Sequence, residues 1–115
     1  MSQAPEPGPL ARLHADAVVF AALGDETRLA LVGRLAERGP LSIATLTVDA
    51  EMTRQAVTKH LEVLASAGIV RDTKKGRERI WQLDPARLAQ ARARIDRVSA
   101  QWDDAIARLR AFVER

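Results

Sequence analysis

The amino-acid sequence predicts a mainly α-helical single domain with a small β-hairpin. Apolar residues recur three and four positions apart through most of the chain, which is typical of amphipathic helices. Residues 69–83 instead favour extended chain, and no proline or glycine interrupts residues 86–115. A length of 115 residues suits one domain with a single core.

The chain is expected to begin with a disordered tail over residues 1–9, which contain three closely spaced prolines. A first helix is expected over residues 10–23, and Gly24 ends it. Its apolar face is formed by Leu10, Leu13, Ala17 and Phe20.

A second helix is expected to start at Asp25, a good N-cap residue, and to stop before Gly39 and Pro40. Its inward stripe is predicted to consist of Leu29, Val32 and Leu35. Ser42 can cap a short third helix that contains Ile43 and Leu46, and residues 48–52 are expected to form a turn.

The next helix, expected over about residues 53–68, has two different faces. Val57, Leu61 and Leu64 recur at i, i+4 and i+7 and form an apolar face, while Thr53 and Gly68 suit its two ends. The other face is polar and consists of Thr53, Arg54, Gln55, Thr58, Lys59 and Glu62. Such a face is often only solvated, but guanidinium and amide groups can pair with base edges, and hydroxyls and lysine suit phosphates.

The short third helix, the turn and this amphipathic helix together predict a helix-turn-helix, which offers its second helix to the major groove of DNA. A β-hairpin is then predicted over about residues 69–84, with its turn at Lys75-Gly76-Arg77. The hairpin carries five cations: Arg71, Lys74, Lys75, Arg77 and Arg79. A basic loop beside such a helix can follow the DNA backbone or enter the minor groove, although charges also protect edge strands from aggregation.

A long last helix is predicted over residues 85–113, because Asp84 and Pro85 form a good start and apolar residues follow a heptad pattern. The helix would extend roughly 43 Å at about 1.5 Å per residue, too far for a small domain to cover alone. If the six large apolar residues of this helix stayed exposed to water, the chain would lose about 9 kcal/mol or more of burial free energy. They are Leu88, Ile95, Val98, Trp102, Leu109 and Phe112. We therefore expect a two-fold homodimer. Its interface is predicted to contain Leu13, Phe20, Leu88, Ile95, Val98, Trp102, Leu109 and Phe112.

Charge and composition narrow the possible functions. The net charge is +3, but residues 1–52 carry −3 and residues 53–115 carry +6, which favours an anionic partner for the second half. No cysteine is present, so the chain has no disulfide, thiolate metal site or cysteine nucleophile. No combination of nucleophile and base is apparent, so we expect neither enzyme activity nor a cofactor.

A cytoplasmic protein is expected. The longest apolar run, residues 17–24, is too short to span a bilayer. The first residues also lack the basic patch and apolar core of a signal peptide.

Four short segments occur in a specific order and spacing. They are Leu23-Gly24-Asp25-Glu26-Thr27-Arg28-Leu29, Ala56-Val57-Thr58-Lys59-His60-Leu61 with Leu64, Ala67-Gly68-Ile69-Val70, and Gly76-Arg77 with Trp81. Together they resemble the signature of the ArsR-type winged-helix transcriptional repressors over about residues 20–84. The resemblance implies a homodimer in which each recognition helix enters a major groove and each wing contacts the flanking DNA. The predicted DNA-binding residues are Thr53, Arg54, Gln55, Thr58, Lys59, His60, Lys74, Lys75, Gly76, Arg77 and Arg79.

The sequence departs from the family pattern at the metal-sensing positions. Ser42 and Ala44 stand where thiolate-sensing members have a Cys-x-Cys pair, and the last helix has no histidine for a zinc site. His14 is interpreted as a surface or dimer-face residue and His60 as a structural or phosphate-facing one. We therefore expect no metal sensing through the family's usual sites.

The resulting prediction is a sequence-specific DNA-binding regulator, a homodimeric repressor that occupies an inverted-repeat operator and competes with RNA polymerase. An inducer, if there is one, stays unidentified. Two alternatives are a winged-helix protein-interaction module and a nonspecific architectural DNA binder. Arg54 and Gln55 can read base edges, which argues against the nonspecific architectural DNA binder.

Overall fold

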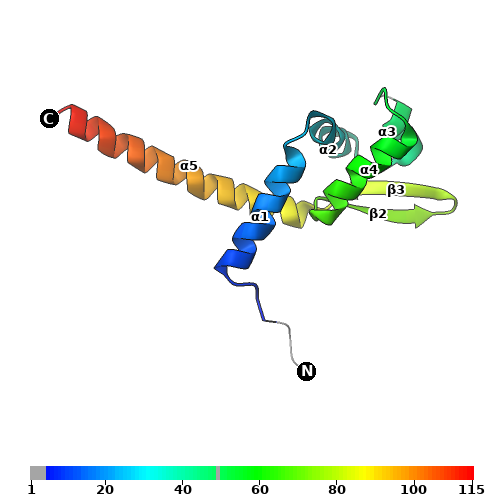
Figure 1. Cartoon of the computed structure of the whole chain (residues 1–115), viewed down its shortest axis with the longest axis horizontal. Helices are drawn as coiled ribbons and strands as arrows, with labels where there is room; N and C mark the ends of the chain where they lie inside the picture. The colour runs from blue at the N-terminus through cyan, green and yellow to red at the C-terminus, as the bar shows by residue number, and fades with distance from the viewer. Residues whose placement is uncertain (1–4, 49) are drawn as a thin grey trace.

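A computed structural model describes residues 5–48 and 50–115 of the chain. The predicted tail over residues 1–9 lies outside the described residues at 1–4, and the prediction was wrong at Pro9, which begins the first helix. Of the predicted turn over residues 48–52, residue 49 lies outside the described residues, and Val48 is instead the last residue of the third helix. The elements follow in the order α1 (Pro9–Leu23), α2 (Glu26–Arg38), β1 (Leu41–Ser42), α3 (Ile43–Val48), α4 (Arg54–Ser66), β2 (Val70–Lys75), β3 (Glu78–Leu83) and α5 (Pro85–Val113). In Figure 1 the hairpin of β2 and β3 extends to one side of the other elements and α5 to the opposite side. The mainly α-helical class is confirmed.

The core forms around the apolar face of α4. Val57, Leu61 and Leu64 are fully buried, as their spacing predicted. They join a cluster contributed by α1, α2, α3, the start of β2, β3 and one residue of α5. At the end of α4, Gly68 adopts a left-handed φ of 81°, and the N–H of Ile69 donates to the carbonyl of Leu64 at 3.0 Å. This closing turn satisfies helix carbonyls and directs the chain into the hairpin.

The predicted inward stripe of α2 was wrong at Leu29. That side chain is 57% exposed, whereas Leu31 and Leu35 are 2% exposed. Helical residues advance by about 100° each, so Leu31 and Leu35, four positions apart, lie nearly on one face. Leu29 lies about 200° from Leu31 and therefore faces away from the core.

The sheet has three strands rather than only a hairpin. Its order is β1-β3-β2 with antiparallel pairing, and Leu41 and Ser42 of β1 pair with Trp81 and Ile80 of β3. A two-residue strand carries no readable period, so the sequence did not predict β1. Ser42 also starts α3 as predicted, since its hydroxyl accepts the N–H of Thr45 at 3.2 Å. The strand thus fixes the start of α3 against the sheet.

Helix α5 starts at a cap in which Asp84 accepts the N–H of Ala86 at 3.1 Å. Ala91 is its buried residue, and the helix continues beyond the core in the direction seen in Figure 1. Large apolar side chains along it are exposed: Ile95, Val98, Trp102, Ile106, Leu109, Phe112 and Val113. No helix among the described residues combines the length and apolar character needed to cross a membrane.

Leu61→Ala should lower the free energy of unfolding by roughly 2 to 5 kcal/mol, because it leaves a cavity at the centre of the core. Leu29→Ala is the matched control and should change it by less than about 0.5 kcal/mol, since Leu29 faces solvent. Urea denaturation at one fixed protein concentration measures both. Equal losses would contradict the assigned faces of α2 and α4.

Candidate nucleic-acid interface

The first turn of α4 is capped by Thr53. Its hydroxyl oxygen accepts the N–H of Ala56 at 3.1 Å, as the sequence predicted. A hydroxyl that accepts still has a proton to donate, so Thr53 can also bind a phosphate oxygen. The positive end of the helix dipole lies at the same place and favours an anion.

Thr58 has a different hydrogen-bonding capacity. Its hydroxyl donates to the carbonyl of Arg54 at 2.8 Å, so the proton is already used within the helix. A phosphate oxygen only accepts, which leaves Thr58 better suited to a base amino group or to the methyl group of thymine.

The outward face of α4 forms a shallow hollow lined by Arg54, Gln55, Thr58, Lys59 and Glu62. Arg54, Gln55 and Lys59 are exposed, and within the described residues none of them bonds to another side chain. Two cations and an amide therefore face solvent on the part of α4 that the core does not use.

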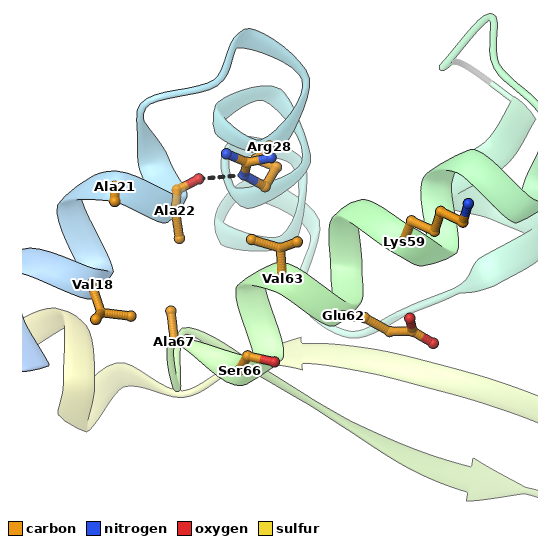
Figure 2. A pocket seen from close by; sticks show the side chains of 9 residues that line it. All are labelled: Val18, Ala21, Ala22, Arg28, Lys59, Glu62, Val63, Ser66 and Ala67. Carbon is orange, nitrogen blue, oxygen red and sulfur yellow. Dashed lines mark hydrogen bonds between the residues drawn. The ribbon is translucent and has the colours of Figure 1, made fainter.

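His60 does not line this hollow. Its Nδ1 lies 3.8 Å from a carboxylate oxygen of Asp25 and 3.4 Å from a guanidinium nitrogen of Arg28, and the side chain is 23% exposed. Arg28 in turn donates through Nε to the carbonyl of Ala22 at 2.6 Å, the bond drawn in Figure 2. His60 thus connects α4 to the start of α2 and the end of α1. Sequence analysis had not assigned Arg28 this role.

Asp25 is the N-cap of α2 and accepts the backbone N–H of Arg28 at 3.0 Å. That bond is the main reason that the pKa of Asp25 lies below its usual value of 3.8. Desolvation of the carboxylate opposes this lowering of the pKa. The charges of Arg28 and His60 add to it, as does a hydrogen bond from the backbone N–H of Thr27. The folded state therefore favours the ionised carboxylate.

The hairpin of β2 and β3 is the wing, and four of its five cations form two groups, while the fifth, Arg71, is exposed on β2. Arg79 donates to a carboxylate oxygen of Asp72 at 2.6 Å, and its guanidinium lies 4.6 Å from the ring centroid of Trp81. The second group, Lys74, Lys75 and Arg77, is exposed around the turn, where Gly76 has a left-handed φ of 64°. The pair Asp72 and Arg79 lies diagonally across the antiparallel strands, a same-face relation that the hairpin register alone would have indicated.

An open cleft of about 670 Å³ lies between α1 and α4 (Figure 2). Its floor consists of small apolar side chains, namely Val18, Ala21, Ala22, Val63 and Ala67. In Figure 2, Lys59 and Glu62 lie on the side of α4 away from α1. The lining has one hydroxyl, Ser66, and no histidine. Among the described residues, no group of three potential metal ligands is present. The cleft is thus an apolar neighbour of the polar hollow.

Comparisons with known proteins agree with this geometry. A family model described as a helix-turn-helix domain matches residues 23–73. The chain is 47% identical over 76 residues to the HTH-type transcriptional regulator Rv2034 of Mycobacterium tuberculosis, covering 66% of this chain and 70% of that one. It is 33% identical over 78 residues to the arsenical resistance operon repressor of Escherichia coli, covering 68% and 67%. A solved ArsR-like transcriptional regulator from Rhodococcus sp. RHA1 aligns with a TM-score of 0.74 and 33% identity, over 87% of this chain and 93% of that one.

The lowered pKa of Asp25 gives a pH prediction. The carboxylate stabilises the fold above the unfolded-state pKa near 3.8, and this contribution is lost as the pH falls through the lower folded-state pKa. Asp25→Asn keeps a capping oxygen but has no charge to lose, so its melting temperature should fall less than that of the native protein in this range. Circular dichroism melts from neutral to acid pH test this, with exposed Asp96→Asn as the control. An acid-induced fall as large in Asp25→Asn as in the native protein would contradict the assignment.

Proposed function

The chain belongs to the ArsR family of winged helix-turn-helix DNA-binding transcriptional regulators, and from this premise we propose that it is a homodimeric repressor of an inverted-repeat operator. The observation that carries the proposal is the exposed polar face of α4, whose Arg54, Gln55 and Lys59 bind no other side chain of the described residues. The opposite face is buried, so this is the face that α4 can offer to a groove.

Each residue of this face has a proposed role that follows from its chemistry. Arg54 and Gln55 read base edges, because a guanidinium and an amide can each form two hydrogen bonds with one base. Thr53 and Lys59 donate to phosphate oxygens, and Thr58 contacts a base amino or methyl group.

The wing is proposed to contact the DNA beside the recognition helix. Lys74, Lys75 and Arg77 are exposed around Gly76 and suit phosphates or the minor groove. We propose that the two remaining predicted residues act mainly by support: Arg79 stiffens the wing through Asp72, and His60 holds α4 against α2.

Dimerisation is proposed through α1 and α5. On α5, Trp102 is 66% exposed and Phe112 is 69% exposed, and Ile95, Val98 and Leu109 are exposed in the same heptad rows. Leu13 of α1 is also exposed. Phe20 and Leu88 pack partly against the chain's own core and would border the interface. Exposed apolar rows of this length are typical of a protein interface, and a two-fold arrangement would present two copies of α4 to successive major grooves. The bound dimer would then exclude RNA polymerase from an overlapping promoter.

Metal-dependent release is not part of the proposal. The relative in Escherichia coli is named for arsenical resistance, but here Ser42 is used in the cap of α3 and Ala44 has no donor atom. Neither residue can supply the thiolate that soft metals favour.

Footprinting on the DNA upstream of the protein's own gene tests the function, and protection of an inverted repeat is expected. Arg54→Ala should weaken binding to that site roughly five- to 150-fold, because one bidentate base contact is worth roughly 1 to 3 kcal/mol. Nonspecific binding should change less.

Arg77→Ala, in the wing, should instead weaken both specific and nonspecific DNA binding and reduce the salt slope by about 1. The matched control is Arg92→Ala on the exposed part of α5. Unchanged affinity and site preference in Arg54→Ala would refute the assignment of α4.

Trp102→Glu should convert the dimer into monomers, because it places a charge in the apolar row of α5. Sedimentation equilibrium measures the mass. Ala100→Glu adds the same charge on the opposite side of the helix and should leave the dimer intact. A dimer that persists in Trp102→Glu would show that the interface lies elsewhere.

A further inference from the structure

A buried ion pair joins α1 to α5. Asp16 is 5% exposed, and the Nε of Arg94 donates to one of its carboxylate oxygens at 2.8 Å. Burying a carboxylate is costly unless a cation and hydrogen bonds compensate it. Neither the core nor the proposed DNA-binding face uses this pair.

The pair lies in a cleft of about 330 Å³ between the two helices. The cleft is lined by Pro7, Arg12, Asp16, Gln90, Ala93, Arg94 and Arg97. The lining therefore contains three arginines and one carboxylate, and this carboxylate is already paired with Arg94. Within the described residues, Arg12 and Arg97 form no ion pair, so the cleft carries an unbalanced charge of two.

The ion pair also orients Arg94. Asp16 holds the Nε edge of the guanidinium, which leaves the N–H groups of the far end available to a ligand. A guanidinium fixed in this way matches the oxygens of a carboxylate or a phosphate and loses little freedom on binding. The amide of Gln90 adds a neutral donor and acceptor to the lining.

We propose that this cleft binds a small polyanion that bears carboxylate or phosphate groups, held by Arg12, Arg94 and Arg97. Resting on the proposed function, the binding also regulates the DNA-binding site. Both walls of the cleft belong to the helices of the proposed dimer interface, so a bound anion that changes the packing of α1 on α5 changes the spacing of the two copies of α4. By linkage, such a ligand alters operator affinity.

Isothermal titration calorimetry of the full chain without DNA tests the site. Citrate and inorganic phosphate are the probes, at constant ionic strength set with chloride. We expect saturable binding of at least one probe, and the one that binds identifies the carboxylate or the phosphate class. Saturable binding of neither would overturn the proposal.

Variants test the position of the site. Arg97→Gln and, separately, Arg12→Gln should weaken binding about tenfold, the loss expected for a charge-assisted hydrogen bond. Arg92→Gln, an exposed arginine of α5 outside the cleft, should bind as the native protein does. An equal loss in Arg92→Gln would indicate attraction to the general charge of α5 and would overturn the site.

Operator binding measured with and without the bound probe tests the regulation. The native protein should change its operator affinity and Arg97→Gln should not respond at the same probe concentration. Calorimetric binding without any change in operator affinity would refute the regulatory role and keep the site. Failure to bind an operator under all conditions would instead refute the proposed function, whatever the calorimetry shows.

Discussion

The structure depends on the burial of one face of α4. Val57, Leu61 and Leu64 are fully buried at the centre of the core, so the helix cannot rotate without exposing them to water. Each such burial contributes roughly 1.5 to 3 kcal/mol, more than an exposed polar contact supplies. Arg54, Gln55 and Lys59 face outward because the core fixes the other side of the helix. The geometry of the polar face is thus a consequence of packing.

The wing is held by the same core. Trp81 is 1% exposed and carries on its ring the guanidinium of Arg79, which also binds Asp72. The pairing of β1 with β3 links this hairpin to the start of α3. Val70 and Trp81 anchor the base of the hairpin in the same core as α3 and α4, so this base keeps a fixed position relative to the outward face of α4. A rigid arrangement of this kind reduces the entropy lost on binding.

Helix α5 combines an attachment to the core with a free surface. Ala91 packs in the core and Arg94 binds Asp16, whereas the apolar rows from Ile95 onward are exposed. A partner that covers those rows would therefore contact the same helix that the buried ion pair fixes to α1. This connection is the physical basis for expecting the cleft at Arg12, Arg94 and Arg97 to communicate with the rest of the molecule.

The sequence by itself determined the features that depend on neighbouring residues. The caps at Asp25, Thr53 and Asp84, the stop at Gly68 and the bounds of the last helix follow from local backbone chemistry and helical spacing. Tertiary structure decided which face of each helix is buried. Leu29 and Leu31 are equally apolar, and only the position of α2 against the core distinguishes them.

Tertiary structure alone also decided the long-range partners. Strand β1 exists because Leu41 meets Trp81, His60 meets Asp25 because α4 packs on α2, and Asp16 meets Arg94 across 78 positions of the chain. Helical periodicity predicts the direction of a side chain around its own axis. It carries no information on the angle at which two helices cross, and that angle determines which charges meet.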